Sequence, residues 1–164
     1  MTTDTIYQLP YLESSVFIAL IKGEIEKGVD RGVIAQNILD DASVGRWPIF
    51  TSTFTLAEVL KDRNKPMLTL SEEKRIDDFF KHGYIKLVTL DREVAELARK
   101  LARTYNLPPP DAVHLASAVK AKADELLTWD DHNFPINHTV EGVKIRLPYW
   151  FGQTAMPLPS HGNT

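Results

Sequence analysis

Four acidic side chains in this sequence have the types and positions that could hold a metal ion. Glu13 and Asp130 each end an expected β-strand, and Glu58 lies in the first turn after another strand. Asp111 opens the helix that follows three consecutive prolines. Carboxylates that are brought together repel one another and cost stability unless a cation neutralises them. The group therefore points to a bound cation.

The chemistry that this group favours is reaction at a phosphate. Oxygen ligands suit a hard cation such as Mg²⁺ or Mn²⁺, and the chain has no cysteine, which excludes disulfides, thiolate catalysis and Cys-ligated metal sites. Such cations serve phosphoryl transfer because they activate a water molecule and stabilise charge on the phosphate oxygens. No dinucleotide-binding loop, serine-hydrolase elbow or zinc-protease helix is present in the sequence.

Each acid alone also has an explanation that needs no ligand. Thr55 and Glu58 have the Thr-x-x-Glu spacing of a helix-capping box, and the helix dipole favours Asp111 at a helix N-terminus. Asp130 and Asp131 suit a turn. The metal hypothesis depends on the four acids occurring together.

The elements that would position these acids alternate between strands and helices. An alternating order predicts a mainly parallel sheet with helices on both faces, a three-layer α/β/α sandwich. Ligands of such sheets bind at the carboxyl ends of the strands, where the acids are expected. Strands are expected at about 11–13, 47–53, 84–90, 125–129 and 144–150, and helices at about 14–22, 35–42, 55–62, 71–80, 91–105 and 111–123.

Length and charge limit the classes of protein to which the chain can belong. A length of 164 residues suits one domain, expected over 1–151, and the Gly-, Pro- and Ser-rich residues 152–164 are expected to form a flexible tail. A net charge of −3 argues against nucleic-acid binding by bulk positive charge. The longest purely apolar run, residues 16–21, is too short to span a membrane. With no signal-peptide pattern at the start, the expected location is cytoplasmic.

Four segments, taken in order, resemble the PIN-domain ribonucleases, a family that includes the VapC-type toxins of bacterial toxin–antitoxin pairs. The resemblance spans about residues 9–134, and its most specific parts are Asp-Ala-Val-His-Leu-Ala and Leu-Leu-Thr-Trp-Asp. The four segments are YLESSVFIAL at 11–20, TLAEVL at 55–60, DAVHLASA at 111–118 and LLTWD at 126–130.

This resemblance implies a fold, an activity and a set of site residues. The fold is the PIN-like α/β/α sandwich, and the activity is hydrolysis of RNA phosphodiester bonds by an endoribonuclease that depends on Mg²⁺ or Mn²⁺. The catalytic and metal-binding quartet carries over onto Glu13, Glu58, Asp111 and Asp130. The implied partners are an RNA substrate, a second copy in a homodimer and, for a toxin, an antitoxin whose segment crosses the acidic site.

Other side chains are expected beside the quartet. His114 is expected to pack against the ligands or orient them, because oxygen-rich Mg²⁺ sites rarely use imidazole. The serines could equally cap a helix, and Asp131 could equally shape a turn. The expected neighbours are Ser14, Ser15, His114, Thr128 and Asp131, and the expected contacts to the RNA backbone are Lys61, Arg63 and Lys65.

Glu13 is the one departure from the family pattern, which usually has aspartate there. The extra methylene moves the carboxylate by roughly 1–1.5 Å, and a misplacement of about 1 Å can cost about 100-fold in rate. The alternative to an active nuclease is therefore a catalytically weakened PIN-like module that binds RNA or protein.

Overall fold

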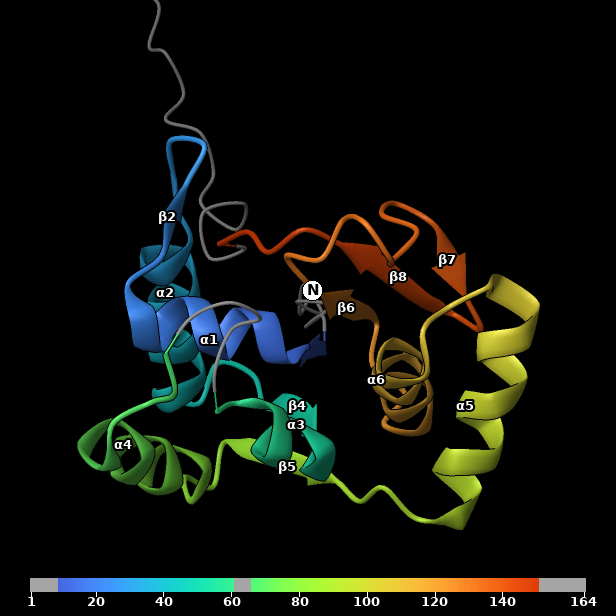
Figure 1. Cartoon of the computed structure of the whole chain (residues 1–164), viewed down its shortest axis with the longest axis horizontal. Helices are drawn as coiled ribbons and strands as arrows, with labels where there is room; N and C mark the ends of the chain where they lie inside the picture. Colours follow the sequence, from blue (N-terminus) through green and yellow to red (C-terminus); the bar gives the residue numbers. More distant parts are fainter. Residues whose placement is uncertain (1–8, 61–65, 151–164) are drawn as a thin grey trace, which may run out of the picture.

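A six-stranded sheet forms the centre of the molecule in the computed structural model, which describes residues 9–60 and 66–150 (Figure 1). Its strand order is β5-β4-β1-β6-β8-β7, and all neighbours pair in parallel except β7 and β8. The expected mainly parallel sheet is thus confirmed. The strands are β1 (Pro10–Leu12), β4 (Ile49–Ser52), β5 (Ile85–Val88), β6 (Glu125–Leu127), β7 (Thr139–Val140) and β8 (Val143–Arg146).

Helices cover both faces of this sheet, which confirms the three-layer arrangement. One face packs against α5 and α6, and the other against α1, α2 and α4 (Figure 1). The short helix α3 follows β4 directly. The helices are α1 (Ser14–Lys22), α2 (Arg31–Ser43), α3 (Thr53–Glu58), α4 (Leu70–Phe80), α5 (Arg92–Tyr105) and α6 (Pro109–Lys120).

Successive residues of the central strands supply the two cores. Tyr11 and Leu126 face α5 and α6, whereas their neighbours Leu12 and Leu127 face α1, α2 and α4. All four side chains are fully buried. Successive side chains of a strand point to opposite faces, so a central strand covered on both faces must be apolar at every position. The apolar sequence of these short strands reflects that double burial.

The helix ends differ from the expected ones where capping residues decide them. Ser52 caps α3, and Glu58 is its last residue, so the capping-box interpretation of Thr55 and Glu58 is wrong. The capping box lies instead at Thr69 and Glu72, at the start of α4. Helix α6 begins at Pro109, two residues before the expected start, because proline is well tolerated in the first helical turn.

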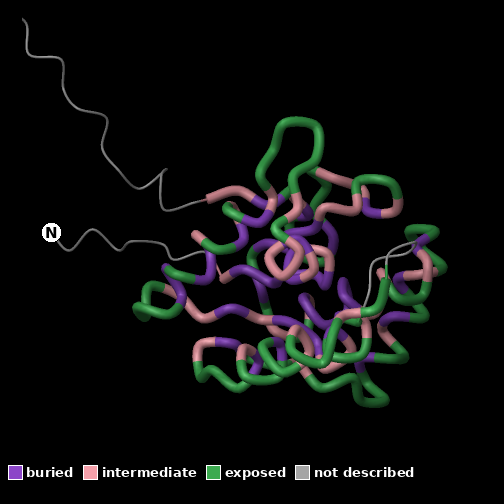
Figure 2. Tube along the Cα trace, turned by 60° about the vertical axis from the view of Figure 1, so that its left-hand side comes forward, coloured by how far each residue is buried: buried purple, intermediate pink, exposed green. Residues whose placement is uncertain are grey.

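Two antiparallel pairings were not expected from the sequence. Strands β2 (Ile25–Glu26) and β3 (Val29–Asp30) form a small separate hairpin between α1 and α2. Lys27 and Gly28 at its tip both have positive φ, as a tight two-residue turn requires. The hairpin projects from the body and is exposed along its length, as the loop at the top of Figure 2 shows. The second unexpected pairing is the antiparallel pairing of β7 with β8.

Some expectations fall on parts of the chain that the structure does not describe. The basic residues Lys61, Arg63 and Lys65 lie outside the described residues, as does the expected tail at 152–164. Within the described ranges, no helix is both long enough and apolar enough to cross a membrane.

Candidate active site

The four predicted carboxylates line one open cleft at the carboxyl ends of the central strands. The cleft has a volume of about 670 Å³. Glu13 directly follows β1 and Asp130 lies just beyond β6, while Glu58 ends the helix that begins at β4. Asp111 is the third residue of α6. Because these strands are parallel neighbours, the chain delivers all four acids to the same edge of the sheet.

Glu13 is held by hydrogen bonds to its neighbours although its side chain is almost entirely buried. Its Oε1 accepts from the Ser14 hydroxyl at 2.5 Å, and its Oε2 accepts from the Ser15 backbone N–H at 3.1 Å. The Thr128 hydroxyl donates to the same Oε2 at 2.9 Å. Glu13 is thus both the N-cap of α1 and a cleft-lining carboxylate. The three donors fix its orientation.

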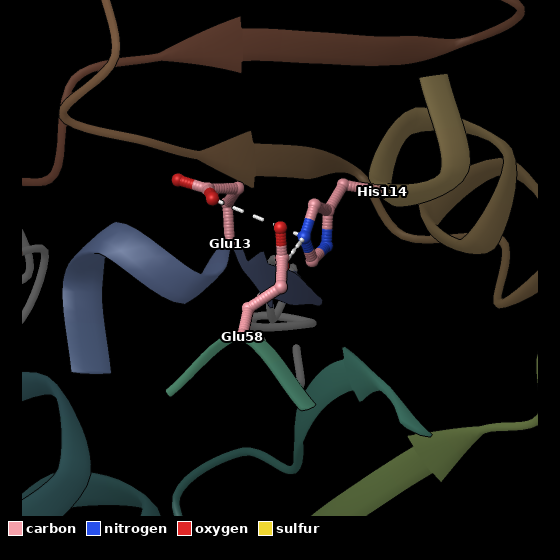
Figure 3. A group of neighbouring side chains, drawn as sticks. All are labelled: Glu13, Glu58 and His114. Carbon is pink, nitrogen blue, oxygen red and sulfur yellow. Dashed lines mark hydrogen bonds and ion pairs between the residues drawn. The ribbon is translucent and has the colours of Figure 1, made fainter. Parts of the chain in front are cut away.

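Glu58 and His114 form a hydrogen-bonded pair next to Glu13 (Figure 3). The Nε2 atom of His114 contacts Oε2 of Glu58 and lies 3.9 Å from Oε1 of Glu13. Its other ring nitrogen, Nδ1, is 2.8 Å from the hydroxyl of Tyr11. Tyr11 and His114 are both fully buried. A continuous chain of hydrogen bonds therefore runs from the core through His114 to Glu58.

The electrostatic environment of His114 favours its charged form. Burial alone would lower its pKa, but the hydrogen bond to Glu58 and the nearby charges of Glu13, Glu58 and Asp111 raise the pKa above its ordinary value. Both ring nitrogens already have partners, so the imidazole orients a carboxylate without being free to bind a metal. His114 thus lies beside the carboxylates, and its role in orienting them stays a prediction.

Asp111 is the acid whose ionisation is most perturbed. Burial raises its pKa to about 7, assisted by the negative charges of Asp130, Glu13 and Glu58 and opposed by His114. Among the described residues Asp111 has no hydrogen-bond or ion-pair partner. A carboxylate that is partly desolvated beside three others has lost solvation without gaining a compensating charge. A cation in the cleft would supply that charge.

Asp130 has a structural role in addition to its place in the cleft. Its Oδ1 accepts the backbone N–H groups of His132 and Asn133, each at 3.1 Å. Its Oδ2 accepts from the Asn133 amide at 3.0 Å. The expected turn is thus formed, and Oδ2 still has acceptor capacity on the cleft side.

The expected neighbours of the quartet separate into two groups. Ser14, Ser15, His114 and Thr128 all contact Glu13 directly or lie within ion-pair distance of it. Ser15 also accepts the Trp129 backbone N–H at 2.9 Å, which ties the start of α1 to the end of β6. Asp131, in contrast, is exposed and does not line the cleft.

The donor set fits a hard divalent cation. Ligand atoms of Glu13 and Glu58 lie within 4.8 Å of one another, and Asp111 and Asp130 line the same cleft. Glu13 and Asp130 each retain an oxygen with spare acceptor capacity, and Asp111 is fully available. Anionic oxygens in this number suit Mg²⁺ or Mn²⁺ better than softer metals.

Three residues of the site were missed by the sequence analysis. Tyr11 supports His114 from within a strand, where its apolar ring looked like core alone. Arg31 and Trp129 line the cleft beside the acids. Trp129 is adjacent in sequence to Asp130, a signal that could have been used. Arg31 comes close only because the unpredicted β2–β3 hairpin returns the chain to Glu24, just after α1, whose carbonyl accepts the Arg31 and Gly32 N–H groups.

The chain is similar to one protein family and to several solved structures. Residues 11–136 match the family model for the PIN domain. None of the curated proteins matches the chain. Among solved structures, a toxin–antitoxin complex from Klebsiella pneumoniae aligns with a TM-score of 0.60 at 23% identity, over 85% of this chain and 98% of that one.

Two further solved structures share the fold at lower identity. The sarcin–ricin loop cleaving toxin VapC20 from Mycobacterium tuberculosis aligns with a TM-score of 0.56 at 15% identity, over 75% of this chain and 91% of that one. VapBC2 from Rickettsia felis, bound to a DNA fragment from its promoter, aligns with a TM-score of 0.55 at 14% identity, over 85% and 98%. The likeness to these structures is one of fold.

Proposed function

The chain belongs to the PIN domain family, and from that premise we propose that it is a metal-dependent endoribonuclease that hydrolyses RNA phosphodiester bonds. The observation that carries this proposal is the convergence of Glu13, Glu58, Asp111 and Asp130 on one cleft. Four acids at one sheet edge are costly unless the site binds cations. RNA presents the phosphates on which cation-assisted hydrolysis acts.

The four carboxylates would hold Mg²⁺ or Mn²⁺, and the metal when bound supplies charge stabilisation to the phosphate and activation of water. Glu13 presents its carboxylate to the cleft in a single orientation because three donors hold it. His114 orients the Glu58 carboxylate, and the hydroxyl of Tyr11 in turn holds the His114 ring. Asp111 has no competing partner among the described residues, so its carboxylate can take a proton from water in the cleft.

Partners of the proposed nuclease follow from its structural neighbours. One neighbour is a toxin–antitoxin complex and another is a VapBC pair. We infer that this chain is a toxin of such a pair, held inactive by an antitoxin, and that it acts in the cytoplasm as a homodimer. Co-expression with a candidate antitoxin, followed by size-exclusion chromatography, tests the complex.

A glutamate at position 13 is compatible with this proposal. The Glu13 carboxylate remains on the cleft wall, with a ligand atom within 4.8 Å of one from Glu58. The longer side chain therefore still reaches the other acids. If the purified protein binds RNA without cutting it and Glu13→Asp cuts, the weakened binding module is the correct description.

Cleavage of a fluorescent, mixed-sequence single-stranded RNA tests the proposal. We expect cleavage with Mn²⁺ or Mg²⁺, none with chelator, and at least a 100-fold loss in Asp111→Asn. Asp77→Asn, an exposed change of the same type on α4, serves as the matched control and should cut like the wild type. Full activity in Asp111→Asn would refute the assignment of the site.

A further inference from the structure

A second group of side chains lines the same cleft without contacting the four carboxylates. Arg31 is the first residue of α2, Trp129 precedes Asp130, and Glu24 and Glu26 belong to the hairpin segment between α1 and α2 (Figure 1). Within the described ranges, Arg31 is the only arginine or lysine that lines the cleft. The group therefore adds a guanidinium, which is always charged, to the wall of the acidic cleft.

The guanidinium of Arg31 lies between carboxylates on one side and an aromatic ring on the other. Its Nη1 is 3.2 Å from Oε1 of Glu24 and 2.6 Å from Oε2 of Glu26. Its Cζ lies 4.7 Å from the centroid of the Trp129 ring. The Glu26 side chain is 44% exposed, so water weakens this ion pair and makes it exchangeable.

Two nitrogen donors in this arrangement have no acceptor. Nε of Arg31 and Nε1 of Trp129 are buried without a hydrogen-bond partner in the described part of the chain. Buried donors without partners are uncommon because each loses its hydration without replacement. Both ion pairs use Nη1, so they engage one of the three guanidinium nitrogens. The arrangement leaves donor capacity for a ligand that accepts hydrogen bonds.

The backbone at Arg31 is fixed while its side chain can change partner. The carbonyl of Glu24 accepts the N–H groups of Arg31 and Gly32 at 2.9 and 3.3 Å, which closes the base of the hairpin. Asp30 caps α2 through the Val33 N–H. A side chain that starts from a rigid backbone and has one ion pair open to water, the pair with Glu26, is suited to changing its anionic partner.

We propose that Arg31, backed by the ring of Trp129, binds a phosphate of the RNA strand beside the bond that is cut, taking it in place of Glu24 and Glu26. This inference rests on the proposed function. The four carboxylates and the two hairpin glutamates repel a polyanion, so the strand needs a positive group close to the site. The planar guanidinium presents two parallel N–H donors to phosphate oxygens, which a lysine cannot do.

Equilibrium binding of a fluorescein-labelled single-stranded RNA tests the proposal, measured by anisotropy in Mn²⁺. All proteins carry Asp111→Asn so that the RNA is bound and not cut. We expect Arg31→Gln to weaken RNA binding about tenfold and to lower the salt slope by about 1. Arg31→Lys should restore only part of the affinity. The matched control is Arg92→Gln on α5, whose partner Glu96 is also a glutamate and which lies outside the cleft.

A double-mutant cycle separates phosphate binding from bulk charge. Glu26→Gln should tighten RNA binding about threefold when Arg31 is present and clearly less when Arg31 is glutamine, because only the relief of general charge repulsion then remains. Mn²⁺ affinity, measured by calorimetry, should be the same in all these proteins. Equal RNA affinity with and without Arg31, or an equal gain from Glu26→Gln in both backgrounds, would overturn this inference and leave the proposed function standing. Parent protein that binds no RNA would overturn the proposed function as well.

Discussion

Asp111 shows that a residue of the site can lower the free energy of unfolding of the protein. Its folded pKa of about 7 lies above the ordinary value of 3.8, because burial and neighbouring carboxylates disfavour the charged form. Between about pH 4 and pH 7 the folded protein therefore binds more protons at this group than the unfolded chain. The contribution of Asp111 to the stability of the metal-free protein therefore falls as pH rises through that range.

Removing the charge at position 111 should relieve this cost. We expect metal-free Asp111→Asn to exceed the wild type in unfolding free energy at pH 8 by about 1–2 kcal/mol, after discounting for screening at this half-buried site. The difference should shrink as pH falls towards 4. Urea denaturation at pH 4, 6 and 8 measures it, and a variant less stable than the wild type at pH 8 would contradict the electrostatic account.

Tyr11 is expected to act on the metal site through His114. Tyr11→Phe removes the hydroxyl 2.8 Å from Nδ1 and leaves that buried nitrogen without its partner. Loss of a contact that directly orients a ligand typically lowers metal affinity by 10- to 100-fold. Tyr11 acts one contact further away, through His114 on Glu58, so we expect Mn²⁺ binding to weaken by no more than about tenfold. Calorimetric titration measures the effect. Tyr105→Phe, on the partly exposed end of α5, is the control and should bind Mn²⁺ like the wild type.

At the scale of elements, the junction of α1 and α2 places Arg31 beside the cleft. Gly32 makes this close approach possible, since a Cβ there would lie 3.1 Å from both the Ala19 carbonyl oxygen and the Gly23 Cα. We expect Gly32→Ala to lower the unfolding free energy by about 1–3 kcal/mol, because the contacts are with backbone that has little room to move. Gly83→Ala, in open space, is the matched control in urea denaturation. Equal stability of the two variants would show that the junction is not tightly packed.

Elements with a strong local pattern could be predicted from the sequence. An apolar stripe predicted α5, and its members Val94, Ala98 and Leu101 are buried. Its other members, Leu97 and Tyr105, are half-buried and exposed, respectively. The β2–β3 hairpin could not be predicted in this way, because its strands have two residues each and carry no buried face. Its only local signal is Gly28 in a tight turn. Short elements whose pairing depends on neighbouring helices leave little trace in the sequence.

At the scale of the whole molecule, the acids of the site and the residues beside Glu13 were predictable, and the buried support behind His114 was not. The order of parallel strands is enough to bring Glu13, Glu58 and Asp130 to one sheet edge. The hydrogen bond between Tyr11 and His114 joins residues 103 positions apart, and no spacing rule indicates it. A supporting residue that is distant in sequence, such as Tyr11, is therefore found only in the folded structure.

Metal binding should stabilise the entire fold. A ligand that binds only the folded state adds about 2.7 kcal/mol at 100 times its dissociation constant. We expect Mn²⁺ at that level to raise the melting temperature of the wild type, with excess chelator reversing the shift. Asp77→Asn should show the same shift and Asp111→Asn a smaller one. Identical shifts in all three proteins would place the bound ion elsewhere.

The central claim is that the cation held by these carboxylates is the one that RNA cleavage requires. The initial rate of cleavage of single-stranded RNA, measured as a function of Mn²⁺ concentration for the wild type and Glu58→Gln, tests it most directly. We predict a rate that saturates with Mn²⁺ in the wild type, vanishes in chelator, and in Glu58→Gln needs at least tenfold more Mn²⁺ to reach half its maximum. Cleavage that persists in chelator, or a curve that is the same for both proteins, would contradict the account.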